Sequence, residues 1–125
     1  MPVLAIGGLF FRAKDPERLA AWYRDHLNVG PGCVAEGEPD EHSWKTEGGP
    51  VVFCPFPSDS DYFEADKAFM LNFRVSDLAA LIEQLESDGV AVTTKPEWEH
   101  PDIGRFARIH DPEGNPIELW EQPKP

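Results

Sequence analysis

Cysteine, basic residues and long apolar runs are all scarce in this sequence. Its two cysteines, Cys33 and Cys54, have no CxxC spacing, so we expect reduced thiols and a cytoplasmic protein rather than a disulfide framework. It has only 11 Lys and Arg against 23 Asp and Glu, a net charge of −12, which argues against nucleic acid because phosphate binding needs clustered Lys and Arg. No apolar run approaches the roughly 20 residues of a membrane span. The N-terminus lacks the basic region of a signal peptide, so we expect none there.

The size and composition predict one globular domain. A chain of 125 residues is long enough for one hydrophobic core. Its 41% hydrophobic and 27% charged residues are ordinary for a folded domain. The 13 prolines favour a loop-rich fold that contains strands over a helix bundle.

The C-terminal stretch 104–121 predicts two strands around a tight turn. Residues 111–115, Asp-Pro-Glu-Gly-Asn, are turn-forming types, and side chains alternate on both flanks. Glu118 is unusual because it lies between Ile117 and Leu119, although Glu is a poor strand former. Its face is therefore either exposed to solvent or the lining of a cavity.

The first and second halves of the chain repeat each other. Residues 9–15 align with residues 71–77 at an offset of 62 positions. Each copy reads as a strand that ends at an aspartate, Asp15 or Asp77, able to cap a following helix. We expect the first helix to end near residues 28–32.

The remaining elements follow from composition. We expect the second helix to end at Gly89 and further strands at residues 50–56, 69–75 and 90–94. Residues 96–104 are expected to form a loop that carries Trp98 and His100. The aromatic residues outside the strands either close the mouth of a pocket or belong to the core; they are Trp44, Phe56, Tyr62, Phe63 and Trp98.

The Asp-Pro-x-Gly-Asn turn followed by Ile-Glu-Leu at 117–119 closely resembles the vicinal oxygen chelate superfamily, which includes glyoxalase I, bleomycin-resistance proteins and extradiol dioxygenases. The resemblance implies an α+β fold in which two β-α-β-β-β modules pair into a cupped mixed sheet. Module one would span about 1–57, a crossover loop about 58–67, and module two about 68–125. The resemblance also implies a homodimer and makes Glu118 the usual metal-ligand position.

The resemblance also implies where the other metal ligands would stand, and the residues there do not suit a metal. The histidine positions fall on Gly8 and Met70, and residues 51–54, Val-Val-Phe-Cys, hold no carboxylate. A Zn, Ni, Mn or Fe site needs three or more protein ligands. We therefore expect no cofactor, with a divalent metal as the alternative. A set of His42, His100 and Glu118 is conceivable, but no spacing supports it.

Strand alternation predicts a mixed aromatic and polar inner face. It is either a small-molecule pocket or an ordinary amphipathic surface with Arg–Glu pairs. Asn72 is the strongest single polar candidate because an amide is a poor strand former and fixes a ligand's orientation well. We assign Glu118 as a candidate general base, and the following residues to substrate binding: Phe10, Arg12, Met70, Asn72, Arg74, Phe106, Arg108 and Trp120.

The sequence leaves three functions open. The first is a small-molecule-binding protein like the bleomycin-resistance proteins, without the usual metal. The second is a lyase or isomerase of the glyoxalase type in which Glu118 is the general base and arginines stabilise the enediolate. The third is an accessory domain without chemistry.

Overall fold

The computed structural model of the chain describes residues 9, 11–29, 46–49 and 51–124. Within these residues the chain forms helices on both sides of the crossover loop and one sheet in the C-terminal half. The elements are α1 (Pro16–Leu27), β1 (Leu71–Arg74), α2 (Leu78–Ser87), the 3-10 helix η2 (Pro96–Trp98), β2 (Glu99–His100), β3 (Gly104–His110) and β4 (Pro116–Glu121). Among the described residues, no helix has the length and apolar character needed to cross a membrane.

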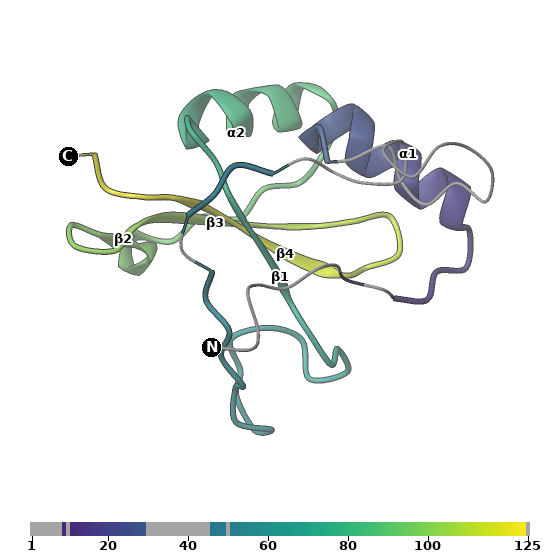
Figure 1. Cartoon of the computed structure of the whole chain (residues 1–125), viewed down its shortest axis with the longest axis horizontal. Helices are drawn as coiled ribbons and strands as arrows, with labels where there is room; N and C mark the ends of the chain where they lie inside the picture. The colour runs from purple at the N-terminus through teal and green to yellow at the C-terminus, as the bar shows by residue number, and fades with distance from the viewer. Residues whose placement is uncertain (1–8, 10, 30–45, 50, 125) are drawn as a thin grey trace.

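The strands form one mixed sheet in the order β1-β4-β3-β2. β1 runs parallel to β4, whereas the β3–β4 and β2–β3 pairs are antiparallel. α1 and α2 lie on one side of this sheet, and the teal segment that leads into β1 loops out on the other side (Figure 1). The two faces of the sheet therefore have different coverings, helices on one and loop residues on the other.

The repeated aspartates cap both helices, as the sequence predicts. Asp15 accepts a hydrogen bond from the Arg18 amide at 3.1 Å, and Asp77 accepts one from the Ala80 amide at 3.1 Å. α1 stops at Asn28, which has a left-handed φ of 56°. Such caps satisfy amides at the helix start that have no partner inside the helix.

The turn between β3 and β4 is built around Asp111. Its buried carboxylate accepts from the Glu113 and Asn115 amides at 2.9 and 3.0 Å and from the Asn115 side chain at 2.8 Å. It also accepts from the Tyr23 hydroxyl at 2.7 Å, which ties α1 to the hairpin. Gly114 has a φ of 82°, a conformation that disfavours other residues. The hairpin prediction is thus confirmed, and the Asp111 carboxylate holds the turn together through these hydrogen bonds.

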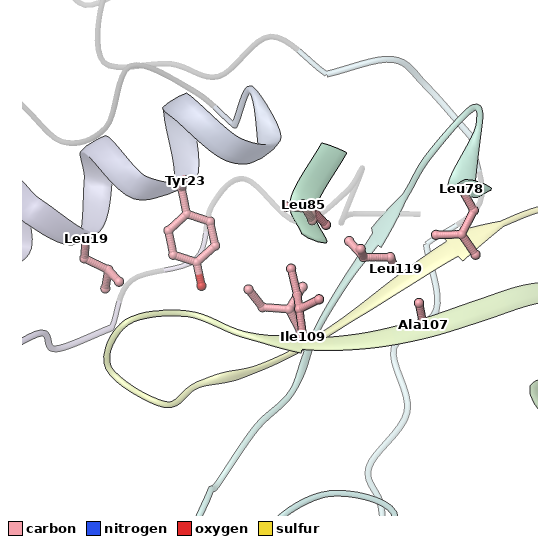
Figure 2. Packing of buried hydrophobic residues seen from close by; sticks show 8 residues of the cluster. Leu19, Tyr23, Leu78, Leu85, Ala107, Ile109 and Leu119 are labelled. Carbon is pink, nitrogen blue, oxygen red and sulfur yellow. The ribbon is translucent and has the colours of Figure 1, made fainter. Parts of the chain in front are cut away.

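The core lies between the helices and the sheet. Figure 2 shows Tyr23 of α1 directed toward the sheet, where Ile109 of β3 and Leu119 of β4 point back toward the helices. Alternation places these apolar side chains on one face of each strand. The buried apolar residues are Leu19, Tyr23, Leu78, Leu85, Ala107, Ile109, Ile117 and Leu119.

The prediction of two complete modules is wrong for the described residues. They form one four-stranded mixed sheet with two helices, within an α+β fold. Residues 51–56 form no strand, and Val52 and Phe53 are 70% and 83% exposed. Residues 90–94 contribute only a single bridge between Thr93 and Arg108. A segment forms a strand only where another strand lies beside it to pair with, and the composition of the segment does not reveal whether such a partner is present.

Other predictions fall wholly or partly on residues outside the described ranges. Most of the predicted first strand, together with Gly8, Phe10, Cys33, His42 and Trp44, lies outside the described residues. Cys54 is free and exposed. The module boundaries near residues 57 and 68 stay predictions.

Candidate functional site

A polar row crosses the sheet on the face away from the helices. Asn72 of β1 pairs in register with Glu118 of β4, and Glu118 pairs with Arg108 of β3. Because Ile117 and Leu119 point into the core, Glu118 between them points the opposite way. Strand alternation thus places an amide, a carboxylate and a guanidinium side by side on one face.

Glu118 is buried, at 8% exposure, yet both carboxylate oxygens have a donor. The Asn72 side-chain amide donates to Oε1 at 2.8 Å, and the Tyr62 hydroxyl donates to Oε2. A buried carboxylate is costly unless it is hydrogen-bonded. These two donors explain how a glutamate is tolerated on a central strand.

Tyr62 comes from the loop before β1 and lies over the polar row. Its ring centroid is 5.8 Å from that of Phe56 and 6.0 Å from that of Trp98. Burial, the hydrogen bond to Glu118 and the negative charge of Glu118 raise its pKa to about 12, against a smaller lowering effect of Arg108. Tyr62 therefore stays protonated at neutral pH and donates its proton to Glu118.

Arg108 is the buried cation of the site, at 6% exposure. Its Cζ lies 4.9 Å from the Tyr62 ring centroid and 5.4 Å from that of Trp98, which are cation–π distances. Nε and Nη2 are buried and have no hydrogen-bond partner among the described residues. The rings hold the guanidinium in place while part of its hydrogen-bonding capacity is unused.

A hollow of about 440 Å³ opens beside Arg108. This volume falls in the range of roughly 300–1,000 Å³ that small-molecule pockets occupy. At its rim, His110 and Glu64 are in contact at 2.8 Å between Nε2 and Oε1. The hollow is lined by Asp59, Ser60, Asp61, Tyr62, Phe63, Glu64, Ala65 and Arg108.

A second row lies next to the polar row, with Trp120 of β4 between Arg74 and Phe106. The rings of Phe106 and Trp120 are stacked, with centroids 6.1 Å apart and an interplanar angle of 9°. The Trp120 indole donates to the Ile103 carbonyl at 2.8 Å. Arg74 is exposed and donates to the Glu47 carbonyl at 3.1 Å. This row extends the aromatic surface of the face, and its arginine is already engaged with the loop.

Residues 5–119 match the Glyoxalase/Bleomycin resistance protein/Dioxygenase superfamily. The chain belongs to this superfamily. A comparison with curated proteins finds no match.

Solved structures show the same fold. The crystal structure of TnmS3, an antibiotic-binding protein from Streptomyces sp. CB03234, matches with a TM-score of 0.62 at 22% identity, covering 98% of each chain. Lactoylglutathione lyase from Agrobacterium tumefaciens matches with a TM-score of 0.55 at 22% identity, covering 97% of this chain and 96% of that one. A glyoxylase/bleomycin resistance protein/dioxygenase domain from Frankia sp. EAN1pec matches with a TM-score of 0.51 at 19% identity, covering 94% and 99%. At these identities the matches show a common fold and do not identify a ligand.

The metal ion that the superfamily implies does not fit the residues around Glu118. Among the described residues, no three His, Cys, Asp or Glu side chains are grouped so that they could hold a metal. Within the described part of the chain, the neighbours of Glu118 are an amide, a phenol hydroxyl and, in the same row, the Arg108 cation. A guanidinium next to the carboxylate repels a divalent cation, and hard cations prefer several anionic oxygen ligands.

The structure brings some predicted site residues together and separates others. Asn72, Arg108 and Glu118 form one row, with Arg74, Phe106 and Trp120 beside it. Met70 is partly buried just before β1, Arg12 is exposed, and Phe10 lies outside the described residues. His100 is exposed on β2. The binding and catalytic roles of these residues stay predictions.

Sequence reasoning did not link Tyr62 and Trp98 to Glu118 and Arg108. It offered both aromatics only as pocket-closing or core residues. The available signal was the density of aromatic residues in loops that flank the predicted inner face.

Proposed function

We propose that this protein is a metal-independent small-molecule-binding member of the superfamily, with its ligand in the hollow on the polar face of the sheet. The hollow of about 440 Å³ carries the proposal because a buried arginine and a tyrosine ring both line it. Binding sites for organic ligands combine apolar and aromatic walls with a few placed polar groups. Tyr62, Phe63 and Arg108 supply that combination here.

The state of Glu118 supports binding over metal-assisted chemistry. Its two oxygens accept hydrogen bonds from Asn72 and Tyr62, and the Arg108 cation lies on the next strand. This arrangement stabilises the carboxylate without a metal. The fold shared with an antibiotic-binding protein supports an organic ligand.

A second candidate is a glyoxalase-type lyase or isomerase with Glu118 as general base. The buried carboxylate beside a guanidinium favours it, because the base would remove a proton next to a carbonyl while Arg108 stabilised the resulting enolate oxygen. A substrate proton would first have to displace Tyr62 from Oε2. Because of this requirement, we favour the binding function over the catalytic one.

We also propose a homodimer in the cytoplasm. The apolar stretch 51–53 is exposed, with Val51 at 66% and Phe53 at 83%, and such a stretch gains stability from being covered. A dimer mass in light scattering at micromolar concentration is expected, and a monomer mass would contradict the assembly.

The binding proposal is tested with a ligand screen on matched variants. Organic compounds are screened for thermal stabilisation of the wild type, and native protein is analysed by mass spectrometry for co-purifying molecules. Stabilisation is expected to fall in Trp98→Leu, because this ring flanks Arg108. Trp22→Leu on α1, on the helix side of the sheet, is the control and should keep the stabilisation. A ligand effect lost in the control and kept in Trp98→Leu would place the site elsewhere.

A further inference from the structure

We propose that Arg108 is a ligand-binding residue that takes the carboxylate of an aromatic or apolar monocarboxylate in the hollow. This inference rests on the proposed small-molecule function and names the chemical class of the ligand. Three observations support it: two nitrogens of Arg108 lack hydrogen-bond partners among the described residues, the nearby carboxylates are bonded to other donors, and aromatic rings flank the guanidinium.

The unused donors of Arg108 lie on one edge of the guanidinium. Nε and Nη2 are the two nitrogens of its side edge, and both are buried without a hydrogen-bond partner among the described residues. Their N–H bonds run parallel, which matches the two oxygens of one carboxylate. Leaving such donors unpaired in a buried position costs stability, so a ligand that accepts both hydrogen bonds recovers that cost.

The carboxylates closest to Arg108 are engaged with other donors. Glu118 is its partner in the strand register, but its oxygens accept from Asn72 and Tyr62. Glu64 also lines the hollow, and it is in contact with His110 at 2.8 Å. Among the described ion pairs none includes Arg108. The guanidinium is thus a fixed positive charge with two donors that the described residues leave unpaired. Because both donors are closed to solvent, a carboxylate reaches them only when a covering side chain such as Tyr62 moves aside.

The rings around Arg108 strengthen the expected contact. Tyr62 and Trp98 lie 4.9 and 5.4 Å from Cζ, so the guanidinium is oriented before a ligand arrives and little side-chain entropy is lost on binding. A hydrogen bond to a charged group is stronger where rings exclude water. The site therefore favours a planar oxyanion at the guanidinium edge.

The rest of the hollow limits the ligand to one negative charge. Tyr62 and Phe63 offer aromatic surface to its body. Asp59 and Asp61 line the same hollow, and the chain has a net charge of −12. A second anionic group would be repelled by these carboxylates. A single carboxylate can be offset by Arg108, so an apolar or aromatic body with one carboxylate matches this lining.

The test compares 1-naphthoate with 1-naphthamide, which has a similar shape and no charge, by calorimetry on the wild type and two variants. Arg108→Lys keeps the positive charge and loses the side edge. Arg105→Lys is the matched control, because Arg105 is exposed on the same strand and contacts Glu99 at 3.3 Å. We expect naphthoate to bind the wild type at least about 10-fold tighter than naphthamide, as for a hydrogen bond to a charged group. Arg108→Lys should lose that preference, and Arg105→Lys should keep it.

Equal binding of the two compounds, or a naphthoate preference that survives in Arg108→Lys, overturns the inference and leaves a hollow that binds ligands of another class. Absence of naphthoate binding to the wild type also overturns it, and the Trp98→Leu comparison then decides separately whether the hollow binds anything. If Arg108→Lys does not fold, the Nε–H resonance of Arg108 in the wild type gives the answer by NMR. It should shift with naphthoate and not with naphthamide, and an unchanged resonance overturns the inference.

Discussion

The hydroxyl of Tyr62 donates a hydrogen bond to the carboxylate of Glu118 across 56 positions of the chain. This contact joins the loop before β1 to the central strand β4 and covers the polar face of the sheet. It also places the Tyr62 ring against the guanidinium of Arg108, at 4.9 Å from Cζ. One loop side chain therefore both satisfies the buried glutamate and forms a wall of the hollow.

The two tyrosines of the chain should resist ionisation in the folded protein. The pKa of Tyr62 is raised from 10.0 to about 12, and burial with the Asp111 hydrogen bond raises that of Tyr23 above its usual range. The unfolded state loses these protons near pH 10, whereas the folded state keeps them. Their contribution to stability is thus complete below about pH 10 and, for Tyr62, is lost as the pH rises toward about 12.

Phenolate absorbance against pH measures this directly. Tyr23→Phe isolates the signal of Tyr62, and Tyr62→Phe isolates that of Tyr23. We expect no phenolate near pH 10 in either variant while it stays folded. Titration near pH 10 in folded Tyr23→Phe would show that Tyr62 is not held against Glu118.

Asn72 should contribute to stability through Glu118. Asn72→Ala removes the donor to Oε1, and we expect a loss of roughly 1–2 kcal/mol in the free energy of unfolding, as for a donor removed from a buried charged acceptor. Asn72→Asp should lose more at neutral pH, because it places a second negative charge beside Glu118.

Urea unfolding compares these variants, with Gln84→Ala on α2 as the control. Gln84 makes a surface hydrogen bond to Asp88, and surface substitutions usually change stability by less than about 0.5 kcal/mol. If Asn72→Asp proved as stable as the wild type, the amide would not be bound to Glu118.

The purified protein should hold no stoichiometric divalent metal. The described groups around Glu118 are the Asn72 amide, the Tyr62 hydroxyl and the Arg108 cation. Gly8 and Met70 stand where the family resemblance implies histidine ligands. Elemental analysis after mild purification is the measurement. About one Zn, Ni, Mn or Fe per chain that disappears in Glu118→Ala would show that the ligands had been misplaced.

Local patterns in the sequence were sufficient for the helices, the hairpin and one face of the sheet. Asp15 and Asp77 cap helices because capping needs only residues three positions apart. The turn at 111–115 follows from residues that bond their own backbone. Strand alternation placed Glu118 and Arg108 on one face, because it has a period of two residues.

Contacts between segments that are distant in the chain could not be predicted from the sequence. The stretch 51–56 has strand composition, yet it has no partner strand among the described residues. From the sequence, Arg12, Arg74 and Arg108 were all assigned to substrate binding. In the structure, the first two are exposed and the third is buried. That difference depends on where Tyr62 and Trp98 lie, which is set by the path of the loop before β1 and by the position of η2 rather than by local residue order.

The central claim is that a small organic molecule binds on the polar face of the sheet beside Arg108. The most direct measurement is an NMR titration of the four tryptophan indole N–H groups with the compound that most stabilises the native protein. We expect the resonance of the Trp98 indole, whose ring flanks Arg108, to shift with the same apparent Kd as the thermal stabilisation of the protein. The Trp22 indole, on the helix side of the sheet, should stay unchanged. Saturable shifts at Trp22 with none at Trp98 would contradict the claim.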